Sequence, residues 1–431
     1  MSVGIRREDK HQWEARTPLT PDGVRALVAL GVPVVVQPST IRAYSDEAYC
    51  QAGAVVQEDL SEVNALFAVK EIPHELLREG GTYVFFSHTI KGQKQNMPLL
   101  KSMMQLGCTL IDYERIVDDD GRRLVFFGRH AGVAGMIDTL SVLGRRLKAQ
   151  GIETALSDIE LAHEYEDLGA AKAVIRAVGE RLEVPRSLAP LLIGFAGYGN
   201  VSQGAQSILD LLPVEVVDPS DLPALTSQTD APRDRVFKVV FEEEHLAERT
   251  DGSAFELQHY YEQPQAYRAI FQRHLVHLSV LVNAIYWTER YPRLVRKDLL
   301  KEEGLSRLLL IGDISCDIEG SVECTVKATT PGLPCYIYDH TTGKVTDGYE
   351  GDGLAMMTTD CLPCELPRES SSSFTEALAP FVAPIAAIDD SGSFEDAGLP
   401  APVAEATILW RGELTPPYRY LVDHVGDLHE R

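Results

Sequence analysis

A glycine-rich turn between an apolar run and an amphipathic segment constrains the fold of this chain more than any other feature. The turn begins at Gly197 and reads Gly-Tyr-Gly-Asn-Val-Ser-Gln-Gly-Ala, directly after the apolar run 190–196. Apolar residues at helical spacing continue over 201–212. Strand, glycine turn and helix in this order suit a dinucleotide pyrophosphate, because glycines allow close backbone approach and a helix N-terminus offers free N–H groups. We therefore expect a nicotinamide cofactor to bind at Gly197, Gly199, Asn200, Val201 and Gly204.

The choice of cofactor depends on the residues that follow the turn. Gly204 follows Gly199 by five residues, whereas the dinucleotide fingerprint has three, so a turn without a ligand is the alternative. Asp218 ends the next apolar run, 19 residues after Gly199, where an acid that binds the adenine ribose is expected. Such an acid favours NAD(H) and repels the 2′-phosphate of NADP(H). Arg233 and Arg235 are candidates to neutralise that phosphate.

The acidic composition argues against several classes of partner. The 431 residues include 64 acidic and 40 basic side chains, which gives a net charge of −24. Nucleic acid and anionic membranes attract positively charged proteins, so we expect neither as a partner. The chain shows no apolar run of about 18 residues and no signal-peptide core, and we expect a cytoplasmic protein. The seven scattered cysteines are expected to be packed thiols, with no metal site.

The order of apolar and amphipathic segments predicts two α/β domains. A chain of this length exceeds one ordinary domain, and short apolar runs alternate with helix-like stretches over the first 130 residues. We expect two Rossmann-like domains with parallel sheets separated by a cleft. Residues 1–130 plus about 331–431 are expected to form the substrate domain, and residues from about 131 to 330 the dinucleotide-binding domain. The predicted strands of the first domain are 34–37, 65–70, 82–87, 109–113 and 124–127.

The dinucleotide-binding domain is expected to begin with two helices, over 131–148 and 169–181. After the glycine turn, the charged stretch 219–254 is expected to be an irregular insertion. Its remaining predicted elements are a helix over 264–273 and strands over 278–283 and 307–313.

Two polar residues follow predicted strands of the first domain. Lys70 ends the run 65–70, and His88 directly follows the run 83–87. Ligands gather at the carboxyl ends of parallel strands, so these residues are a candidate acid/base pair whose pKa values depend on burial and neighbouring charges. Taken singly, each residue also fits an ordinary loop position.

Further charged residues complete the candidate substrate site. Arg16 and Arg123 are candidates to hold substrate carboxylates through bidentate hydrogen bonds, although most arginines are simply solvated. Glu71 and Glu114 also follow predicted strands, and they are candidates to bind an amine or to tune Lys70.

A series of motifs runs in order along nearly the whole chain. Together they resemble the family of lysine-forming saccharopine dehydrogenases, and most closely the lysine–ketoglutarate reductase half of aminoadipic semialdehyde synthase. Alanine dehydrogenase and the nucleotide-binding subunit of transhydrogenase belong to the wider superfamily. The motifs are Arg6-Arg-Glu-Asp9, Glu14-Ala-Arg-Thr-Pro-Leu-Thr-Pro21, Val69-Lys-Glu71, Phe85-Phe-Ser-His-Thr-Ile-Lys-Gly-Gln93, Leu110-Ile-Asp-Tyr-Glu114, Phe127-Gly-Arg-His-Ala-Gly-Val-Ala-Gly-Met136, the glycine turn, Val282-Asn-Ala-Ile-Tyr-Trp287 and Gly312-Asp-Ile-Ser315.

The resemblance implies a reaction and assigns roles within it. Lysine, 2-oxoglutarate and a reduced nicotinamide cofactor would give saccharopine, with Lys70 and His88 as the acid/base pair. The resemblance favours NADP(H), in conflict with Asp218, and we favour NADP(H) over NAD(H). It also implies a separate glutamate-forming saccharopine dehydrogenase that acts on the product. By resemblance, the substrate-binding residues are Arg16, Glu71, Lys91, Glu114, Arg123 and Phe127, and Asn283 and Asp313 contact the cofactor, with Asp313 near the nicotinamide.

Two departures from the family pattern keep other amine substrates open. His130 replaces an aromatic residue of the relatives, and the loop Cys316–Cys324 matches the family pattern only in part. The alternatives are an alanine-dehydrogenase-like or opine-type enzyme with a different amine or keto acid, and a nucleotide sensor without catalysis. Retention of both Lys70 and His88 argues against the sensor.

Overall fold

The computed structural model describes residues 1–301, 305–388 and 392–426 and divides the chain into two compact units. The first unit comprises Met1–Phe127 and Pro367–Arg431, and the second comprises Gly128–Leu366. The chain therefore re-enters the first unit at Pro367, not near residue 331 as the sequence suggested. Across the described residues, no helix combines the length and the apolar character that a membrane crossing requires.

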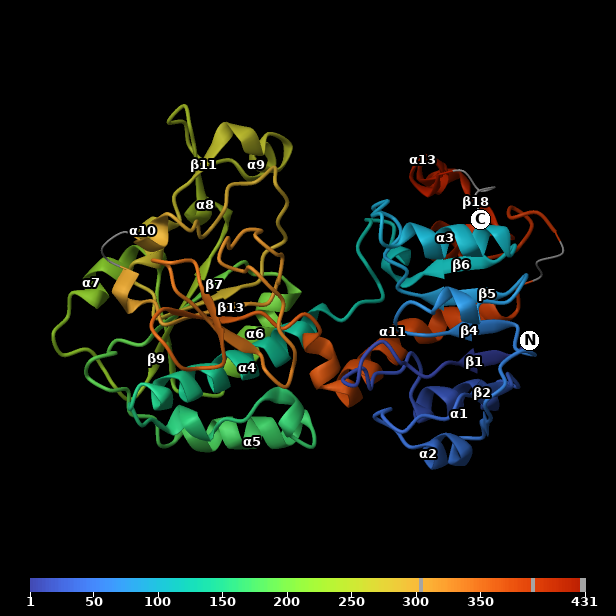
Figure 1. Cartoon of the computed structure of the whole chain (residues 1–431), viewed down its shortest axis with the longest axis horizontal. Coiled ribbons are helices and arrows are strands. Elements are labelled where there is room, and N and C mark those ends of the chain that lie inside the picture. Colours follow the sequence, from blue (N-terminus) through green and yellow to red (C-terminus); the bar gives the residue numbers. More distant parts are fainter. Residues whose placement is uncertain (302–304, 389–391, 427–431) are drawn as a thin grey trace. The chain divides into compact units, whose positions relative to one another are not determined.

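The first unit is built on an eight-stranded sheet with the order β18-β17-β6-β5-β4-β1-β2-β3. The strands β1 to β6 are parallel, and β17 and β18 add an antiparallel edge. Figure 1 shows the order from β6 through β5, β4 and β1 to β2. The strands are β1 (Val3–Ile5), β2 (Val34–Val36), β3 (Val55–Val56), β4 (Ala65–Phe67), β5 (Thr82–Phe85), β6 (Thr109–Asp112), β17 (Thr407–Trp410) and β18 (Glu413–Leu414).

Short helices connect and cover this sheet. Thr20 caps the first of them, because its side chain accepts a hydrogen bond from the Gly23 N–H and Pro21 occupies the first turn. The longest helix, α11, buries Phe374, Leu378 and Val382 in the same apolar core as the strands. The helices are α1 (Pro21–Ala29), α2 (Asp46–Gln51), α3 (Met97–Gln105), α11 (Pro367–Ala386), α12 (Ala401–Ala406) and α13 (Val422–Val425).

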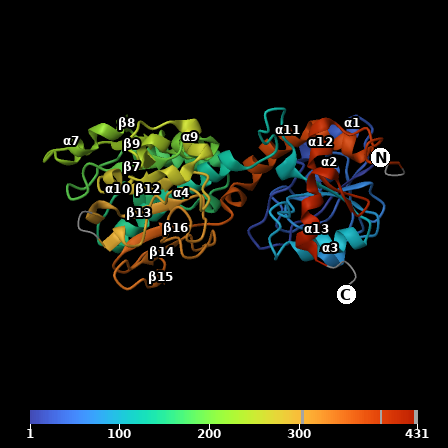
Figure 2. The ribbon, with the colours of Figure 1, turned by 90° about the horizontal axis from the view of Figure 1, so that it is seen from above.

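The second unit has its own eight-stranded sheet, in the order β15-β14-β16-β13-β12-β7-β9-β8. Figure 2 shows this order from β8 to β15. The six neighbouring strands β8, β9, β7, β12, β13 and β16 are parallel, whereas β14 and β15 form an antiparallel edge. The strands are β7 (Leu192–Ala196), β8 (Val214–Val216), β9 (Val236–Phe241), β12 (Val280–Asn283), β13 (Leu310–Asp313), β14 (Cys335–Tyr338), β15 (Val345–Asp347) and β16 (Leu354–Met357).

A small excursion with its own aromatic cluster leaves this sheet after β9. It contains the antiparallel pair β10 (Ala247–Arg249) and β11 (Tyr267–Ala269), with Tyr260 and Tyr267 packed together. Figure 1 shows α9 and β11 standing at one end of the unit, away from α4 and α5. The helices of the unit are α4 (Gly128–Ala149), α5 (Leu168–Gly179), α6 (Asn200–Leu209), α7 (Leu222–Thr226), α8 (Glu243–Leu246), α9 (Leu257–Glu262) and α10 (Gln272–Leu275).

The two sheets confirm the predicted fold class, whereas several local predictions are wrong. Residues 124–127 form no strand, and only an isolated bridge joins Arg123 to Val117. The stretch 219–254 is not an irregular insertion, because it supplies β9, which lies between β7 and β8. The predicted helix over 264–273 is replaced by a 3₁₀ turn, by β11 and by the start of α10.

Candidate active site and cofactor site

The candidate acid/base residues follow neighbouring parallel strands of the first unit. Strands β4 and β5 pair in parallel with Phe67 opposite Val84. Lys70 lies three residues beyond the end of β4, and His88 three residues beyond the end of β5. Both loops therefore leave the same edge of the sheet, as the sequence predicted. Glu71 joins them, because its Oε1 lies 3.7 Å from the His88 Nε2.

Burial of His88 favours its neutral form at neutral pH. Burial lowers the pKa of His88 from 6.5, Lys70 lowers it further, and the Glu71 carboxylate opposes the shift. Burial raises the pKa of Glu71, but the hydrogen bond of 2.9 Å from the Lys10 ammonium, a backbone hydrogen bond and the charges of Lys10 and His88 together lower this pKa overall. His88 also has a φ of 52°, in the left-handed region that side chains other than glycine rarely occupy. Such backbone strain concentrates at functional sites.

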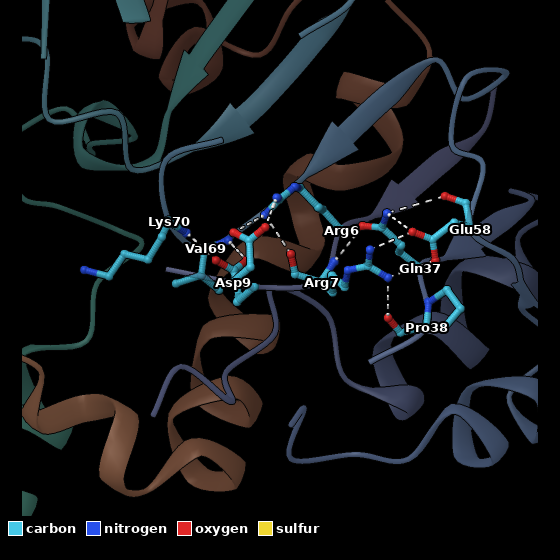
Figure 3. Close-up of polar contacts among 9 residues, drawn as sticks. Arg6, Arg7, Asp9, Gln37, Pro38, Glu58, Val69 and Lys70 are labelled. Carbon is cyan, nitrogen blue, oxygen red and sulfur yellow. Dashed lines mark hydrogen bonds and ion pairs between the residues drawn. The ribbon is translucent and has the colours of Figure 1, made fainter. Parts of the chain in front are cut away.

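A buried carboxylate fixes the loop that carries Lys70. Glu8 accepts hydrogen bonds from the Val69 N–H at 2.6 Å and from the Lys70 N–H at 3.0 Å. Figure 3 shows the Lys70 side chain extending away from this polar network. The backbone on which Lys70 sits is thus held while its ammonium group stays available. Burial, with a contribution from Glu14, raises the pKa of Glu8 to about 7.

A second buried carboxylate does the same beside His88. Asp112 ends β6 and accepts hydrogen bonds from the Ser87 N–H at 3.0 Å and from the Glu114 N–H at 2.8 Å. It also accepts one from the Ser87 hydroxyl. Burial raises the pKa of Asp112 to about 6. Neither Glu8 nor Asp112 was predicted from the sequence, although both lie in motifs of the family pattern.

The other predicted substrate residues differ in what the structure leaves them to do. Arg16 is buried, and it donates to both carboxylate oxygens of Glu14 at 2.7 and 2.6 Å. Its guanidinium also lies 4.4 Å from the ring centre of Phe127, which stacks on Phe374. A substrate carboxylate would therefore have to compete with Glu14 for this side of Arg16.

Arg123 and Lys91 are more accessible than Arg16. Arg123 is about half exposed and forms an ion pair with Glu114, whose charge also acts on His88. Lys91 lies on an exposed turn three residues after His88. Both cations can therefore meet an anionic substrate that approaches from solvent.

The glycine turn of the second unit has the geometry that a pyrophosphate requires. Gly197 has a φ of 93°, which favours glycine. Gly199 caps α6, and a Cβ built on it would meet no atom within 4 Å. Asn200 and Val201 then begin the first turn of α6, and the backbone N–H groups of this turn point outward from the helix N-terminus. The space in front of Gly199 and the free N–H groups of α6 fit a bound phosphate.

Gly204 has a packing role that differs from the prediction. It is buried, and a Cβ on it would overlap the carbonyl oxygen of Arg129 in α4. Gly204 therefore permits close contact between α4 and α6 and does not line the turn.

The strand order moves Asp218 away from the glycine turn. Strand β8, which Asp218 follows, pairs only with β9 and forms the sheet edge, so β9 separates it from β7. The exposed Asp218 carboxylate accepts hydrogen bonds from the Ser220 N–H at 2.9 Å and from its hydroxyl at 2.7 Å. These hydrogen bonds lower the pKa of Asp218, which caps a local turn.

The two arginines proposed for a 2′-phosphate lie at the wrong end of the sheet. Arg235 directly precedes β9 and pairs with Glu215 at 3.1 Å, and Arg233 donates to the Val184 carbonyl at 2.6 Å. Both arginines therefore lie at the amino end of β9, whereas the glycine turn lies at the carboxyl end of this strand. They do not neutralise a phosphate near Asp218.

Asn283 and Asp313 lie opposite each other at the ends of β12 and β13. The Asn283 Nδ2 donates to the Asp313 Oδ1 at 2.8 Å and to the Ser321 hydroxyl at 2.9 Å, and Thr325 donates to Asp313. Burial raises the pKa of Asp313 to about 6. Within the described part of the chain, the Asn283 Oδ1 is buried and has no hydrogen-bond partner.

A pocket of about 520 Å³ opens beside the glycine turn. Its size lies within the range of small-molecule and cofactor sites. This pocket was not predictable from the sequence, because α9 and the loop after β12 supply much of its wall. The lining residues are Gly197, Tyr198, Gly199, Phe241, Glu243, Leu246, Tyr260, Tyr261, Ala284, Ile285, Tyr286, Trp287, Tyr291, Pro292 and Leu294.

Sequence and structure comparisons identify known proteins that this chain resembles. Residues 4–134 match the family described as alanine dehydrogenase/PNT, N-terminal domain. The chain is 36% identical to alpha-aminoadipic semialdehyde synthase, mitochondrial, from Mus musculus over 97% of its own length and 47% of that protein. It therefore spans about half the length of that relative.

Two further comparisons cover whole proteins. Saccharopine dehydrogenase [NAD(+), L-lysine-forming] from Yarrowia lipolytica is 25% identical over 88% of this chain and 91% of that protein. A solved structure of L-alanine dehydrogenase superposes with a TM-score of 0.62 at 19% identity, covering 99% of this chain and 100% of the other. Residues 4–134 are thus similar to the alanine dehydrogenase/PNT N-terminal domain, and the chain is similar to about half of the alpha-aminoadipic semialdehyde synthases and to most of the lysine-forming saccharopine dehydrogenases.

Proposed function

We propose that this protein condenses L-lysine with 2-oxoglutarate and reduces the product to saccharopine, with a nicotinamide cofactor as reductant. One observation carries the proposal: Lys70 and His88 follow adjacent parallel strands, with Glu71 within 3.7 Å of His88. The names of the homologues, which include lysine-forming saccharopine dehydrogenases, support this choice of substrates.

The acid/base chemistry is divided between the two residues. The side-chain amine of lysine must be neutral before it attacks the keto carbon, and neutral His88 accepts its proton at Nε2. The carbinolamine must then lose its hydroxyl as water, and the Lys70 ammonium donates the proton that this step needs. The Glu71 carboxylate, whose Oε1 lies 3.7 Å from the His88 Nε2, stabilises the imidazolium that forms. The imine carbon is then reduced, so one C–N bond is formed and one water is released.

The dehydrogenase homologues imply a nicotinamide cofactor, and the glycine turn fits one. The reduced cofactor supplies a hydride when bound. Gly197 and Gly199 let the backbone approach its pyrophosphate, and the α6 N–H groups bind the phosphate oxygens. The resemblance favours NADP(H), whereas the full-length saccharopine dehydrogenase relatives carry NAD(+) in their names.

The substrates and the product carry several carboxylates, which require cationic partners. Arg123 and Lys91 are the accessible candidates among the predicted cations of the first unit. Bidentate binding by Arg123 would exchange Glu114 for a substrate carboxylate, because both compete for the same guanidinium. We also propose that a glutamate-forming saccharopine dehydrogenase consumes the product.

The experiment follows oxidation of NADH and NADPH with lysine plus 2-oxoglutarate and identifies the product by mass spectrometry. Ammonia plus pyruvate, and ornithine plus 2-oxoglutarate, serve as matched alternatives. We expect saccharopine and a clear preference for lysine. Faster turnover of ammonia plus pyruvate would overturn the proposal.

A further inference from the structure

The residue that meets the adenine ribose follows from the strand order of the second unit. Strand β9 pairs with β7 over its whole length, with Phe241 opposite Ala196. Gly197 directly follows β7, and its N–H donates to the Phe241 carbonyl at 3.0 Å. The chain that leaves β9 therefore stands next to the glycine turn, in the position where Rossmann folds place the acid that binds the ribose.

Glu243 occupies this position and faces the pocket. It lines the cavity together with Gly197, Tyr198 and Gly199. The Tyr261 hydroxyl from α9 donates to its Oε1 at 2.7 Å, which fixes the carboxylate beside the turn. Burial and the Glu243 carboxylate raise the pKa of Tyr198 in the turn itself. Glu243 is thus held between the turn and α9.

The pocket provides the surroundings that an adenosine group requires. Seven of its lining residues are aromatic, namely Tyr198, Phe241, Tyr260, Tyr261, Tyr286, Trp287 and Tyr291. Flat aromatic faces bind an adenine ring by stacking and burial. Glu243 is the one charged side chain among the described residues that line this pocket, so the wall offers a 2′-phosphate no cation.

Asp218 lacks each of these features. It follows the edge strand β8, is exposed, and uses its Oδ1 to cap its own turn. It does not line the pocket.

We propose that Glu243, and not Asp218, accepts a hydrogen bond from the 2′-hydroxyl of the adenine ribose and selects NAD(H) over NADP(H). This inference rests on the proposed use of a nicotinamide cofactor. A carboxylate at this place accepts from a hydroxyl and repels a phosphate, so it acts on specificity without touching the reacting atoms.

Isothermal titration calorimetry tests the proposal without any turnover, with ADP-ribose and 2′-phospho-ADP-ribose as probes. We expect the wild-type protein to bind ADP-ribose at least about tenfold more tightly than its 2′-phosphate, the effect of one lost charge-assisted contact. Glu243→Gln should weaken ADP-ribose about tenfold and remove the preference. Asp218→Asn, the matched control, should leave both affinities unchanged.

A second variant guards against misfolding of the first. Tyr261→Phe keeps the ring but removes the hydroxyl that holds Glu243, and it should reduce the preference several-fold with little change in melting temperature. A wild-type preference for the 2′-phosphate, or a preference that Asp218→Asn abolishes and Glu243→Gln leaves intact, overturns the assignment of Glu243 alone. If the wild type binds neither probe nor NADH nor NADPH, the proposed function fails, and this inference fails with it.

Discussion

Gly132 of α4 and Gly204 of α6 each lie against the backbone of the other's helix. A Cβ on Gly132 would overlap the Val201 carbonyl oxygen and lie 2.8 Å from the Ala205 nitrogen. A Cβ on Gly204 would overlap the Arg129 carbonyl oxygen and lie 3.2 Å from the Val133 nitrogen. The two glycines therefore set the distance between α4 and the helix whose N-terminus faces the candidate cofactor site.

Gly204→Ala should destabilise the second unit. The added methyl group meets backbone atoms, which cannot move aside as a flexible side chain can. We expect a loss of about 3 kcal/mol, the upper end of the range for overpacking. Thermal and urea unfolding measure this loss. A variant as stable as the wild type would mean that α4 and α6 do not make this contact.

Gly199→Val should have the opposite profile. Its φ of −73° and ψ of −171° are allowed for valine, and the space beside it is open, so the melting temperature should stay near that of the wild type. Cofactor binding should be lost, because the side chain fills the place of the pyrophosphate. Calorimetry with NADH and NADPH checks this outcome, and unchanged affinity would place the cofactor elsewhere.

Lys70→Met and His88→Gln should each lower kcat by about 100-fold or more, which is the range for loss of a general acid or base. The affinity for the cofactor should change little, because both residues belong to the first unit and the glycine turn to the second. Stopped-flow kinetics and calorimetry on the same preparations separate the two effects. Near-normal turnover in either variant would remove that residue from the mechanism.

The pKa of His88 provides a test that needs no substrate. Glu71 raises this pKa and burial lowers it, so Glu71→Gln should move the titration of His88 to a lower pH than in the wild type. NMR of the imidazole, assigned by comparison with His88→Gln, measures both titrations. A shift to higher pH would show that Glu71 does not act on His88 through its charge.

The sequence predicted the elements whose signals are local. Short apolar runs identified β4, β5 and β7, and the polar residues at the ends of the first two runs located Lys70 and His88. The place of Asp218 was not predictable in this way, because it depends on the pairing of β7 with β9, whose Ala196 and Phe241 are distant in sequence. The short apolar run of β9 is embedded in charged residues, and this hid both the strand and Glu243.

The same distinction between local and distant signals applies to the buried carboxylates. Glu8 and Asp112 look like surface acids in the sequence, yet each accepts backbone N–H bonds from a loop that carries a candidate catalytic residue, two for Glu8 and one for Asp112. Their roles become visible only when the strands that they serve are side by side. Gly204 is a similar case, since its partner is the backbone of a helix that precedes it by many residues.

Glu8 leads to a prediction about the pH dependence of stability. Its pKa is about 7 in the folded chain and 4.5 in the reference state, so the folded form binds the proton more tightly than the unfolded form. Between these two values, the contribution of Glu8 to the free energy of unfolding falls as the pH rises, because the unfolded state has already lost its proton. A shift of this size corresponds to about 3 kcal/mol.

Since Glu8→Gln cannot ionise, the wild type should lose more stability than the variant between about pH 5 and pH 8. Urea unfolding of both proteins at the two pH values, followed by tryptophan fluorescence, measures the difference, and the carboxylates that do not interact with Glu8 cancel in the comparison. Equal losses in the two proteins would mean that Glu8 is ionised throughout this range, and that the Val69 and Lys70 amides meet a permanent carboxylate.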